Sequence, residues 1–498
     1  MAVPDETLPS CPIKHIPLEL LLRITYWLST PDLGSMRLTC RAIEKMLYHS
    51  FAEEFFSRKQ FMLSQFSVQA LIDISKSRMG GHIRRLQFGT DMMAGYPGYG
   101  QPTILTAEAY SAECEFLNTS LHRDMLAEAL RNLNNLEDVV IRDFNSTRRS
   151  RDGPAAQWRS YGSSTARREL GFTLQMNQQL FSTTPLYHFP ARVFMSLLDA
   201  LGASEARPAG IEIMTRFGSN LADFAFSLNP SLRPSVVSML NRLEKLHLSI
   251  NFGWKDGESF DPASIQTHMQ SKSLARFLGH THNLKNLRIN EVGKFNGGLE
   301  SFLMWLAHPA PLDPTTPHDQ DWPAPVALPR LEDLSLGHMS TQDTVLLDII
   351  KKFAPSLKSL ELWRVCLVWS RPLHLDGHDG NIYKRFLSHL VEIPELNLRH
   401  IQTGNIEEKV HEKGTDRAPF DKRRVSFKDT GSNSTYTGSD WKYFVQEMIS
   451  TLTSTKVPDP NHREDPGQDE DTSNGMVHPL AHLLTRSFSN LNRRVLRL

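Results

Sequence analysis

Short leucine-rich segments that alternate with helical runs constrain the fold of this chain more than any other feature. Four segments share a Leu-x-x-Leu-x-Leu pattern and begin at Leu243 (LEKLHLSIN), Asn283 (NLKNLRIN), Arg330 (RLEDLSLGH) and Ser356 (SLKSLELWRVCL). Apolar residues alternate at the end of each segment, which is the periodicity of a β-strand. Runs such as RVFMSLLDAL and TVLLDIIKKFA lie before or between them and have helical spacing. The alternation predicts an α/β fold built from stacked strand–helix units.

The spacing of these segments decides whether they form a regular repeat. Their leading leucines are Leu243, Leu284, Leu331 and Leu357, at intervals of 41, 47 and 26 residues. A regular leucine-rich repeat has a period of about 20–29 residues, so only the last interval fits and the longer ones require loop insertions. Weaker copies of the pattern begin at His82, Asn135 and Pro394. We therefore expect an irregular leucine-rich-repeat-like strand–helix solenoid over residues 80–402, with a nonrepetitive α/β domain as the alternative.

Composition narrows the class of protein. The 498 residues include 55 Lys+Arg and 55 Asp+Glu, so the formal charge is zero. Dedicated nucleic-acid or membrane-surface proteins normally have an excess of basic residues, and this balance argues against both classes. Four cysteines are too scattered for a disulfide framework, which predicts a reducing compartment, cytoplasmic and/or nuclear. The first residues lack the basic start and apolar core of a signal peptide. No apolar stretch has the length of a membrane span, so we expect no membrane partner.

Residues 16–56 form the strongest local signal near the start of the chain. After Pro17, the residues Leu20, Leu21, Ile24 and Leu28 follow at helical spacing. The sequence Ser-Thr-Pro-Asp then ends one helix and begins another, with Thr30 as the predicted N-cap. Three short helices in about 40 residues form too small a core to be stable alone. Such a module needs a neighbour, which is either a partner protein or, in the alternative, the domain that follows.

This stretch resembles an F-box, the helical module that docks substrate receptors on the Skp adaptor of cullin-RING ubiquitin ligases. The resemblance rests on the order and spacing of IP, ELL, DL and MRLTCR across about 30 residues, with Ile16 and Thr39 as mild departures from the usual leucine and valine. Together with the body, the chain is similar to fungal F-box proteins with irregular leucine-rich repeats. The resemblance implies adaptor contacts at Ile16, Pro17, Leu20, Leu21, Ile24, Leu28, Leu33 and Leu38. Sequence alone does not separate contact residues from core residues among them.

The remaining segments are assigned by composition. We expect an F-box at 15–57, a helical linker at 58–79, a basic flexible loop at 145–168, a polar segment of low order at 403–440, a packing segment at 441–452, an acidic disordered segment at 453–475 and an amphipathic segment at 476–498. Within the polar segment, KRRVS resembles a basophilic-kinase site, which makes Ser426 a candidate phosphosite. Trp363 and Trp369 are candidate aromatic contacts on the repeat surface.

The chain lacks the motifs of common catalytic sites. It has no phosphate-binding loop and no GxSxG elbow, and the group His374, Asp376 and His378 is interpreted as a polar turn. We therefore expect no catalytic, cofactor or metal-binding residues and no cofactor. The predicted function is a noncatalytic substrate-recognition subunit of a Skp–cullin–F-box ubiquitin ligase. Two alternatives stay open: an adaptor-binding scaffold acting outside a cullin ligase, and an enzyme whose site is dispersed along the chain.

Overall fold

The described part of the chain is a mixed α/β structure with open sheets. In this computed structural model the described residues are 13, 16–92, 104–145, 150–153, 157–170, 189–216, 221–252, 272–291, 297–311, 322–368, 381–411 and 420–457. They contain 14 α-helices and two sheets, neither of which closes into a barrel. The expected amphipathic segment 476–498 lies outside these residues, as do His374, Asp376, His378 and Trp369.

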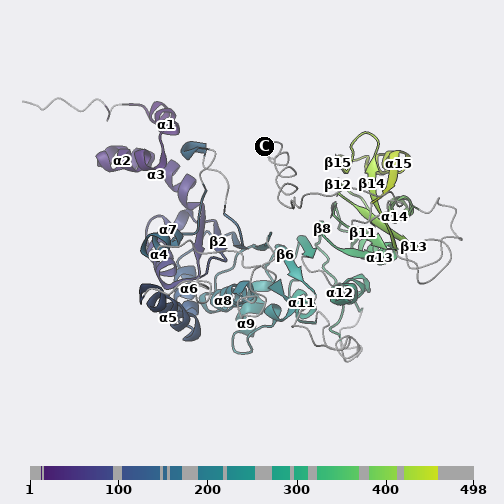
Figure 1. The fold of residues 1–498 in the computed structure, drawn as a ribbon, viewed down its shortest axis with the longest axis horizontal. Helices are drawn as coiled ribbons and strands as arrows, with labels where there is room; N and C mark the ends of the chain where they lie inside the picture. Colours follow the sequence, from purple (N-terminus) through teal and green to yellow (C-terminus); the bar gives the residue numbers. More distant parts are fainter. Residues whose placement is uncertain are drawn as a thin grey trace, which may run out of the picture. The chain divides into compact units, whose positions relative to one another are not determined.

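Three helices at the N-terminus form a module with a core of its own, which we call the helical module (Figure 1). They are α1 (Leu18–Tyr26), α2 (Thr30–Thr39) and α3 (Arg41–Phe56). The fully or nearly buried core residues of this module are Leu21, Leu33, Ile43, Leu47 and Phe55. This cluster is separate from the much larger core of the rest of the chain, which we call the body.

The body is organised on one long sheet that is parallel except at its last strand. Its strands are β1 (Arg58–Met62), β2 (Arg85–Gly89), β3 (Asp138–Arg142), β4 (Gly210–Met214), β5 (Leu221–Ala222), β6 (Lys245–Asn251), β7 (Asn286–Glu291), β8 (Asp333–Gly337), β10 (Ser359–Trp363), β12 (His400–Gly404) and β15 (Asn433–Thr437). Neighbours in the sheet follow chain order, except that β5 pairs with β6 off the main path and that strands of a second sheet lie between some of them in the chain. Only β15 runs antiparallel, against β12.

Most of the helices that follow the strands cover one face of this sheet, in a row that runs along the lower side of Figure 1 and turns upward at its right-hand side. The helices of the body are α4 (Gln65–Lys76), α5 (Ile104–Asn118), α6 (Leu121–Arg131), α7 (Ser163–Leu170), α8 (Phe189–Ser204), α9 (Arg233–Leu240), α11 (Lys272–Leu278), α12 (Gly297–Ala307), α13 (Asp343–Phe353), α14 (Ile382–Glu392) and α15 (Trp441–Thr451). Of these, α7 belongs to the insertion beside β1 and not to the row. Short 3₁₀ turns add η2 (Gly80–His82), η3 (Ser150–Asp152) and η5 (Asp223–Phe226). Neighbouring helices pack on one another along the row. Right-handed crossovers between parallel strands place the connecting helices on the same side of the sheet.

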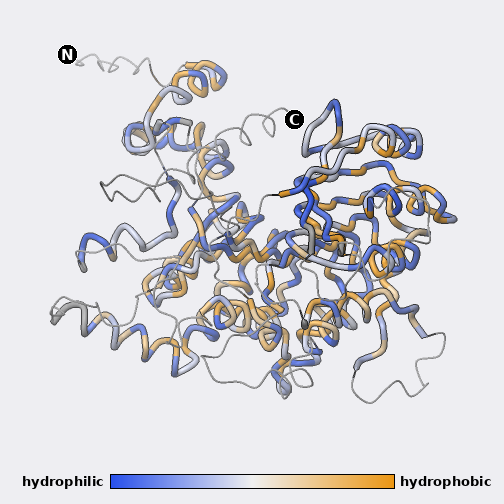
Figure 2. Tube along the Cα trace, turned by 45° about the vertical axis from the view of Figure 1, so that its right-hand side comes forward, coloured by the Kyte–Doolittle hydropathy of each residue, from blue (hydrophilic) through white to orange (hydrophobic). Residues whose placement is uncertain are grey.

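The alternation in the sequence separates the two faces of the sheet. One continuous apolar row crosses eight strands in register: Leu86, Val139, Ile211, Leu246, Leu287, Leu334, Leu360 and Ile401. All of these side chains are buried under the helices. Polar side chains such as Gln87, Glu212, Arg288 and Glu361 occupy the next positions and point to the opposite face. Figure 2 shows the resulting mixture of hydrophobic and hydrophilic stretches along the strands.

Backbone geometry recurs where the sequence spacing does not. The carbonyl of Glu244 accepts two N–H groups, from Lys285 at 2.8 Å and Asn286 at 2.9 Å, where strand β7 begins. The carbonyls of Lys285 and Glu332 repeat this arrangement at β8 and β10. The strand starts are therefore equivalent in hydrogen bonding, and insertions of different length are confined to the connections between them.

A second sheet arises from corners that follow three consecutive strands. It contains β9 (Ser340–Gln342), β11 (Cys366–Val368), β13 (Glu407–His411), β14 (Phe420–Phe427) and β16 (Leu452–Lys456). The first residue of each corner has a positive φ: His338 at 57°, Arg364 at 54° and Asn405 at 49°. The N–H of His338 donates to the Trp363 carbonyl at 2.8 Å, and that of Arg364 donates to the Gly404 carbonyl at 2.7 Å. The corners thus stack on one another and turn the chain from the long sheet into the second sheet.

Three expectations from composition need correction. Residues 58–79 are not only a helical linker, because β1 at Arg58–Met62 is the first strand of the long sheet. The described residues of 403–440 are not low in order, since the end of β12 and all of β13, β14 and β15 lie there. The segment 453–475 begins inside strand β16, and only its later part lies outside the described residues. In these segments polar residues occupy edge or antiparallel strands with one face in solvent. Such strands have the polar composition that was interpreted as disorder.

Candidate functional site

Helix α1 carries two apolar stripes that are offset by one residue. Leu21, Thr25 and Leu28 follow one another at spacings of four and three residues and face the core of the helical module, where Leu21 is fully buried. Leu20 and Ile24 begin the second stripe, which Trp27 continues with the same spacing. A helix that buries one apolar stripe and exposes another has an apolar surface available for a binding partner.

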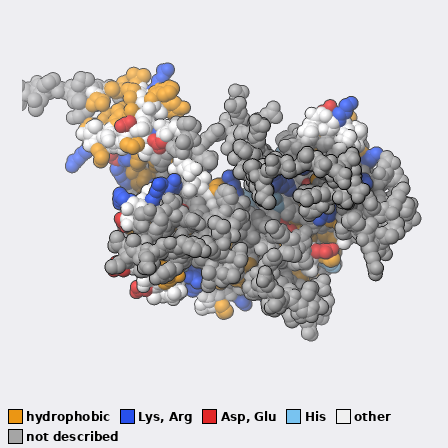
Figure 3. Space-filling model, viewed as in Figure 1, with side chains coloured by type: hydrophobic (Ala, Val, Ile, Leu, Met, Phe, Trp, Pro, Cys, Tyr) orange, Lys and Arg blue, Asp and Glu red, His pale blue; other side chains and the backbone are white. Residues whose placement is uncertain are grey.

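The exposed stripe is part of a larger apolar surface on α1 and α2. Exposed fractions are 53 % for Leu20, 45 % for Ile24, 79 % for Trp27 and 87 % for Leu38. Figure 3 shows hydrophobic side chains gathered over this end of the chain. We call the group Pro17, Leu18, Leu20, Ile24, Tyr26, Trp27 and Leu38 the apolar face. Large apolar side chains in solvent favour a binding surface over a structural cap.

The eight residues that the F-box resemblance implies as adaptor contacts differ in solvent exposure. Pro17, Leu20, Ile24 and Leu38 are exposed and belong to the apolar face. Leu21 and Leu33 are buried in the core of the helical module, with exposed fractions of 0 % and 3 %. Ile16 and Leu28 are half-buried and pack against that core. Only the exposed residues are directly available to a partner.

Three members of the apolar face were not predicted from the sequence: Leu18, Tyr26 and Trp27. The rings of Tyr26 and Trp27 meet edge to face, with centroids 5.3 Å apart. For Trp27 a signal was present in the sequence, because this residue lies three residues after Ile24 and seven after Leu20, on the same helical face. Leu20, Leu21, Ile24 and Leu28 were predicted to form one stripe, and they belong to two.

The start of α2 differs from the predicted one by one residue. Ser29 is the N-cap, and its hydroxyl accepts the Asp32 N–H at 3.3 Å. Thr30, the predicted cap, instead binds Asp152 of η3: its N–H donates to Oδ1 at 2.7 Å and its hydroxyl donates to Oδ2 at 2.6 Å. A carboxylate from the body thus takes up a free amide at the first turn of α2.

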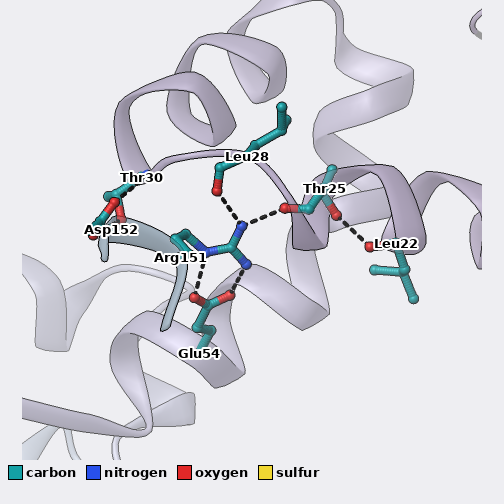
Figure 4. A network of polar contacts seen from close by, with 7 residues as sticks. All are labelled: Leu22, Thr25, Leu28, Thr30, Glu54, Arg151 and Asp152. Atoms are coloured by element: carbon teal, nitrogen blue, oxygen red, sulfur yellow. Dashed lines mark hydrogen bonds and ion pairs between the residues drawn. The ribbon is translucent and has the colours of Figure 1, made fainter. Parts of the chain in front are cut away.

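Arg151 makes a second connection from the same turn to the helical module (Figure 4). Its guanidinium forms a two-point ion pair with Glu54 on α3, with N–O distances of 2.8 and 2.6 Å. The remaining donor reaches the carbonyl of Leu28 at 2.9 Å and that of Thr25. Only 10 % of the Arg151 side chain is exposed. Planar guanidinium groups suit this combination of a paired carboxylate and carbonyls at a helix end.

Residues 150–153 and 157–170 therefore do not behave as the flexible basic loop that composition predicts. Arg151 and Asp152 bridge three elements, and the indole of Trp158 stacks on Phe55 of α3 with centroids 6.0 Å apart. Helix α7 follows directly. The composition of this insertion gives the number of its cations, but not that Arg151 has a carboxylate and two carbonyls as partners. We call Arg151, Asp152 and Trp158 the clamp.

The solvent-facing side of the long sheet carries paired charges. Lys245 Nζ lies 2.8 Å from Asp138 and 2.9 Å from Glu212, and Arg85 pairs with the same two carboxylates. Burial lowers the pKa of His247, on the same face, to about 4, so the imidazole is neutral at pH 7. This face therefore presents polar groups that ion pairs hold in place.

Two further candidate residues lie in ordered structure. Ser426 is half-buried on β14, a strand hydrogen-bonded on both sides, and its hydroxyl lies 3.0 Å from that of Thr453. A kinase would have to pull this strand out of the sheet to reach it. Trp363 is half-buried on β10, and a side chain at Gly404 would overlap its ring, so this tryptophan has a packing role.

The described residues offer no alternative catalytic centre with a metal. No group of three or more His, Cys, Asp or Glu side chains with metal-binding geometry occurs among them. Burial raises the pKa of the Cys366 thiol to about 11, which disfavours its nucleophilic thiolate. None of the described helices combines the length and apolarity needed to cross a bilayer.

Comparison with known proteins does not assign the chain to a family. No family model matches the sequence, and no curated protein matches it.

Proposed function

We propose that this protein is a substrate-recognition subunit of a Skp–cullin–F-box ubiquitin ligase, with the helical module as the F-box. The apolar face on α1 and α2 is the observation that carries the proposal. Leu20, Ile24 and Trp27 are exposed although the module has its own buried core, so they are not needed to hold the helices together. An apolar helix face of this kind suits docking on an apolar partner surface such as that of the Skp adaptor.

The body supports the second half of the proposal, which is presentation of a substrate. We infer that its strand–helix units are irregular leucine-rich-repeat-like units. Equivalent hydrogen bonds at the strand starts and stacked left-handed corners at His338, Arg364 and Asn405 favour a repeat over a nonrepetitive α/β domain. The receptor performs no chemistry itself and acts by raising the effective concentration of the substrate near the conjugating enzyme.

The clamp gives this role a physical basis. A receptor must hold its substrate at a defined distance from the adaptor, and a flexible joint would spread the substrate over many positions. Arg151 and Asp152 join the ends of α1 and α2 to the body through charge-assisted hydrogen bonds. These contacts come from an insertion between β3 and α8, far from the helical module in sequence.

Co-expression with the Skp adaptor tests the proposal. The double variant Leu20→Asp with Ile24→Asp puts two charges on the apolar face, and we expect it to lose the adaptor in size-exclusion chromatography while remaining folded. Tyr443→Asp is the matched control, because Tyr443 is an exposed aromatic residue of the body, 64 % accessible. Equal recovery of adaptor by the parent chain and the double variant would contradict the proposal.

A second measurement separates the ligase from the scaffold alternative. The adaptor complex is mixed with cullin and run again on the same column. Co-elution of all three chains supports the ligase role, whereas an adaptor complex that excludes cullin supports a scaffold outside the ligase.

A further inference from the structure

A basic pocket lies on the solvent-facing side of the sheet, next to the clamp. It has a volume of about 970 Å³ and lies between strands β1 to β4 and residues 157–167. Its cationic side chains are Arg58, Lys59, Arg85, Arg142, Arg159 and Arg167. The acidic side chains that line it are Glu54 and Asp152. We call this site the basic pocket.

The two acids do not neutralise these cations. Glu54 is paired with Arg151 and Asp152 binds Thr30, so both are committed to the clamp. Arg85 is balanced by Asp138 and Glu212. Arg58 and Arg167 are both exposed and form no ion pair with any residue that the structure describes. The basic pocket therefore carries an excess of positive charge in a chain whose formal net charge is zero.

The floor of the basic pocket is a buried polar network. Gln60 bridges two groups: its amide donates to the Ser160 hydroxyl at 2.8 Å and its carbonyl oxygen accepts from Arg142 at 2.6 Å. Ser160 in turn donates to the buried carboxylate of Asp91. A side chain at Gly89 would overlap Ser160 and Asp91, so this position requires glycine. Burial lowers the pKa of Arg142 to about 10, which leaves its guanidinium charged at pH 7.

Residues 160–162 fix the wall of the basic pocket against the edge of the sheet. The backbone N–H of Tyr161 donates to the backbone carbonyl of Gln60 at 2.8 Å, and the hydroxyl of Ser67 donates to the backbone carbonyl of Tyr161 at 2.8 Å. Gly162 follows with a φ of 94°, a conformation that favours glycine. The wall is therefore held by backbone contacts, and its cations project from a fixed frame.

We propose that the basic pocket binds an anionic segment of a protein, with clustered phosphate or carboxylate groups held by Arg58, Arg159 and Arg167. Guanidinium groups bind both kinds of anion through paired N–H donors. The role of the basic pocket in recognising a substrate rests on the proposed function, whereas the binding of an anionic segment does not depend on it.

Several features favour a protein segment over a nucleic acid. Neutral donors and acceptors, namely Gln87, Gln157, Ser164 and Thr165, line the basic pocket beside the cations and suit peptide amide groups. Nucleic-acid sites are usually open basic grooves that follow a strand, and this one is bounded by the clamp.

Fluorescence anisotropy with the full chain tests the inference. The probes are a labelled peptide of alternating glycine and glutamate, the same peptide with phosphoserine in place of glutamate, and a neutral version with glutamine. A labelled single-stranded oligonucleotide of similar charge is the fourth probe. We expect saturable binding of the two anionic peptides, tighter for phosphoserine, weakened by salt, and no binding of the neutral peptide.

The double variant Arg58→Glu with Arg167→Glu should weaken binding of both anionic peptides about tenfold or more. Arg330→Glu, at an exposed arginine elsewhere on the body, is the matched control and should leave binding within about twofold. Absence of saturable binding, or equal affinity of parent and double variant, would overturn the inference. Tighter binding of the oligonucleotide that the double variant also loses would assign the basic pocket to nucleic acid instead.

Adaptor binding distinguishes this inference from the proposed function. Arg58 and Arg167 are not on the apolar face, so the double charge variant should co-elute with the Skp adaptor as the parent does. A chain that binds the phosphoserine peptide but not the adaptor would refute the F-box proposal alone. A chain that binds the adaptor but no anionic peptide would refute the basic pocket alone.

Discussion

The helical module leaves Leu20, Trp27 and Leu38 in solvent, whereas the body keeps an apolar row from Leu86 to Ile401 under its helices and carries charged and amide side chains on the opposite face of the sheet. The helical module has five buried apolar residues in its core, and the body has a continuous core along the whole long sheet. Large apolar residues that stay exposed beside a small core favour the docking role proposed for this module. The body instead buries its apolar row in its own core.

The largest expected effect concerns the core of the helical module. Leu21→Ala removes a fully buried side chain from a small cluster, and we expect a loss of about 4 kcal/mol in the stability of this module. Hydrogen exchange followed by mass spectrometry should show fast exchange in α1 to α3 and unchanged protection in the body. Leu20→Ala, next to it on the apolar face, should leave protection unchanged. Loss of protection across the body would mean that the two regions fold as one unit.

The next effect concerns the clamp. Arg151→Ala removes the partner of Glu54 and leaves the carbonyls of Thr25 and Leu28 without this donor, which should cost about 3 kcal/mol of attachment between helical module and body. Limited proteolysis should then cut between the two regions faster than in the parent chain. Arg168→Ala serves as the control, because Arg168 is exposed and pairs only weakly with Glu169 at 3.8 Å. Equal cleavage rates in the parent chain and Arg151→Ala would show that the clamp does not hold the regions together.

A smaller, pH-dependent effect is expected within the body at Glu291. This residue follows Leu287 and Ile289 on the apolar face of β7 and is 2 % exposed. Its Oε1 atom makes no hydrogen bond to any described residue. Burial raises its pKa from 4.5 to about 8. The folded chain therefore holds a proton that the unfolded chain releases between these values, and stability falls as pH rises through this window.

Glu291→Gln removes this dependence, because glutamine has no proton to release. We expect urea midpoints of parent and variant to be closest at pH 5 and the variant to be more stable by about 2 kcal/mol at pH 8. Glu395→Gln, at an exposed position, is the control and should follow the parent at both pH values. A variant with the same fall in stability as the parent would show that Glu291 is ionised in the folded chain.

The alternation of apolar and polar residues predicted most of the body. Segments beginning at Leu243, Asn283, Arg330 and Ser356 contain strands β6, β7, β8 and β10, and their leading leucines are buried. The second sheet was missed, because its strands β9 and β11 have only three residues each, too few to show the alternation of a strand. Left-handed residues at these corners are histidine, arginine and asparagine, not glycine, so the usual turn signal was absent.

The candidate site was predicted in part. Order and spacing of the apolar residues in 16–56 located the helical module, but adjacent residues such as Leu20 and Leu21 have the same chemistry and opposite burial. Which of them faces solvent depends on how α1 packs on α3. The clamp had no sequence signal, since Arg151 and Glu54 are 97 residues apart.

Sequence by itself determined the strand–helix alternation, the apolar character of the first helices and the balance of charge. These are local properties, because side-chain periodicity and composition act within a few residues. Tertiary structure alone decided which leucines form the apolar face, how the clamp joins the helical module to the body, and that cations from β1, β2, β3 and residues 157–167 meet in the basic pocket. Such contacts join residues far apart in the chain, and only folding brings them within the few ångströms over which packing and hydrogen bonds act.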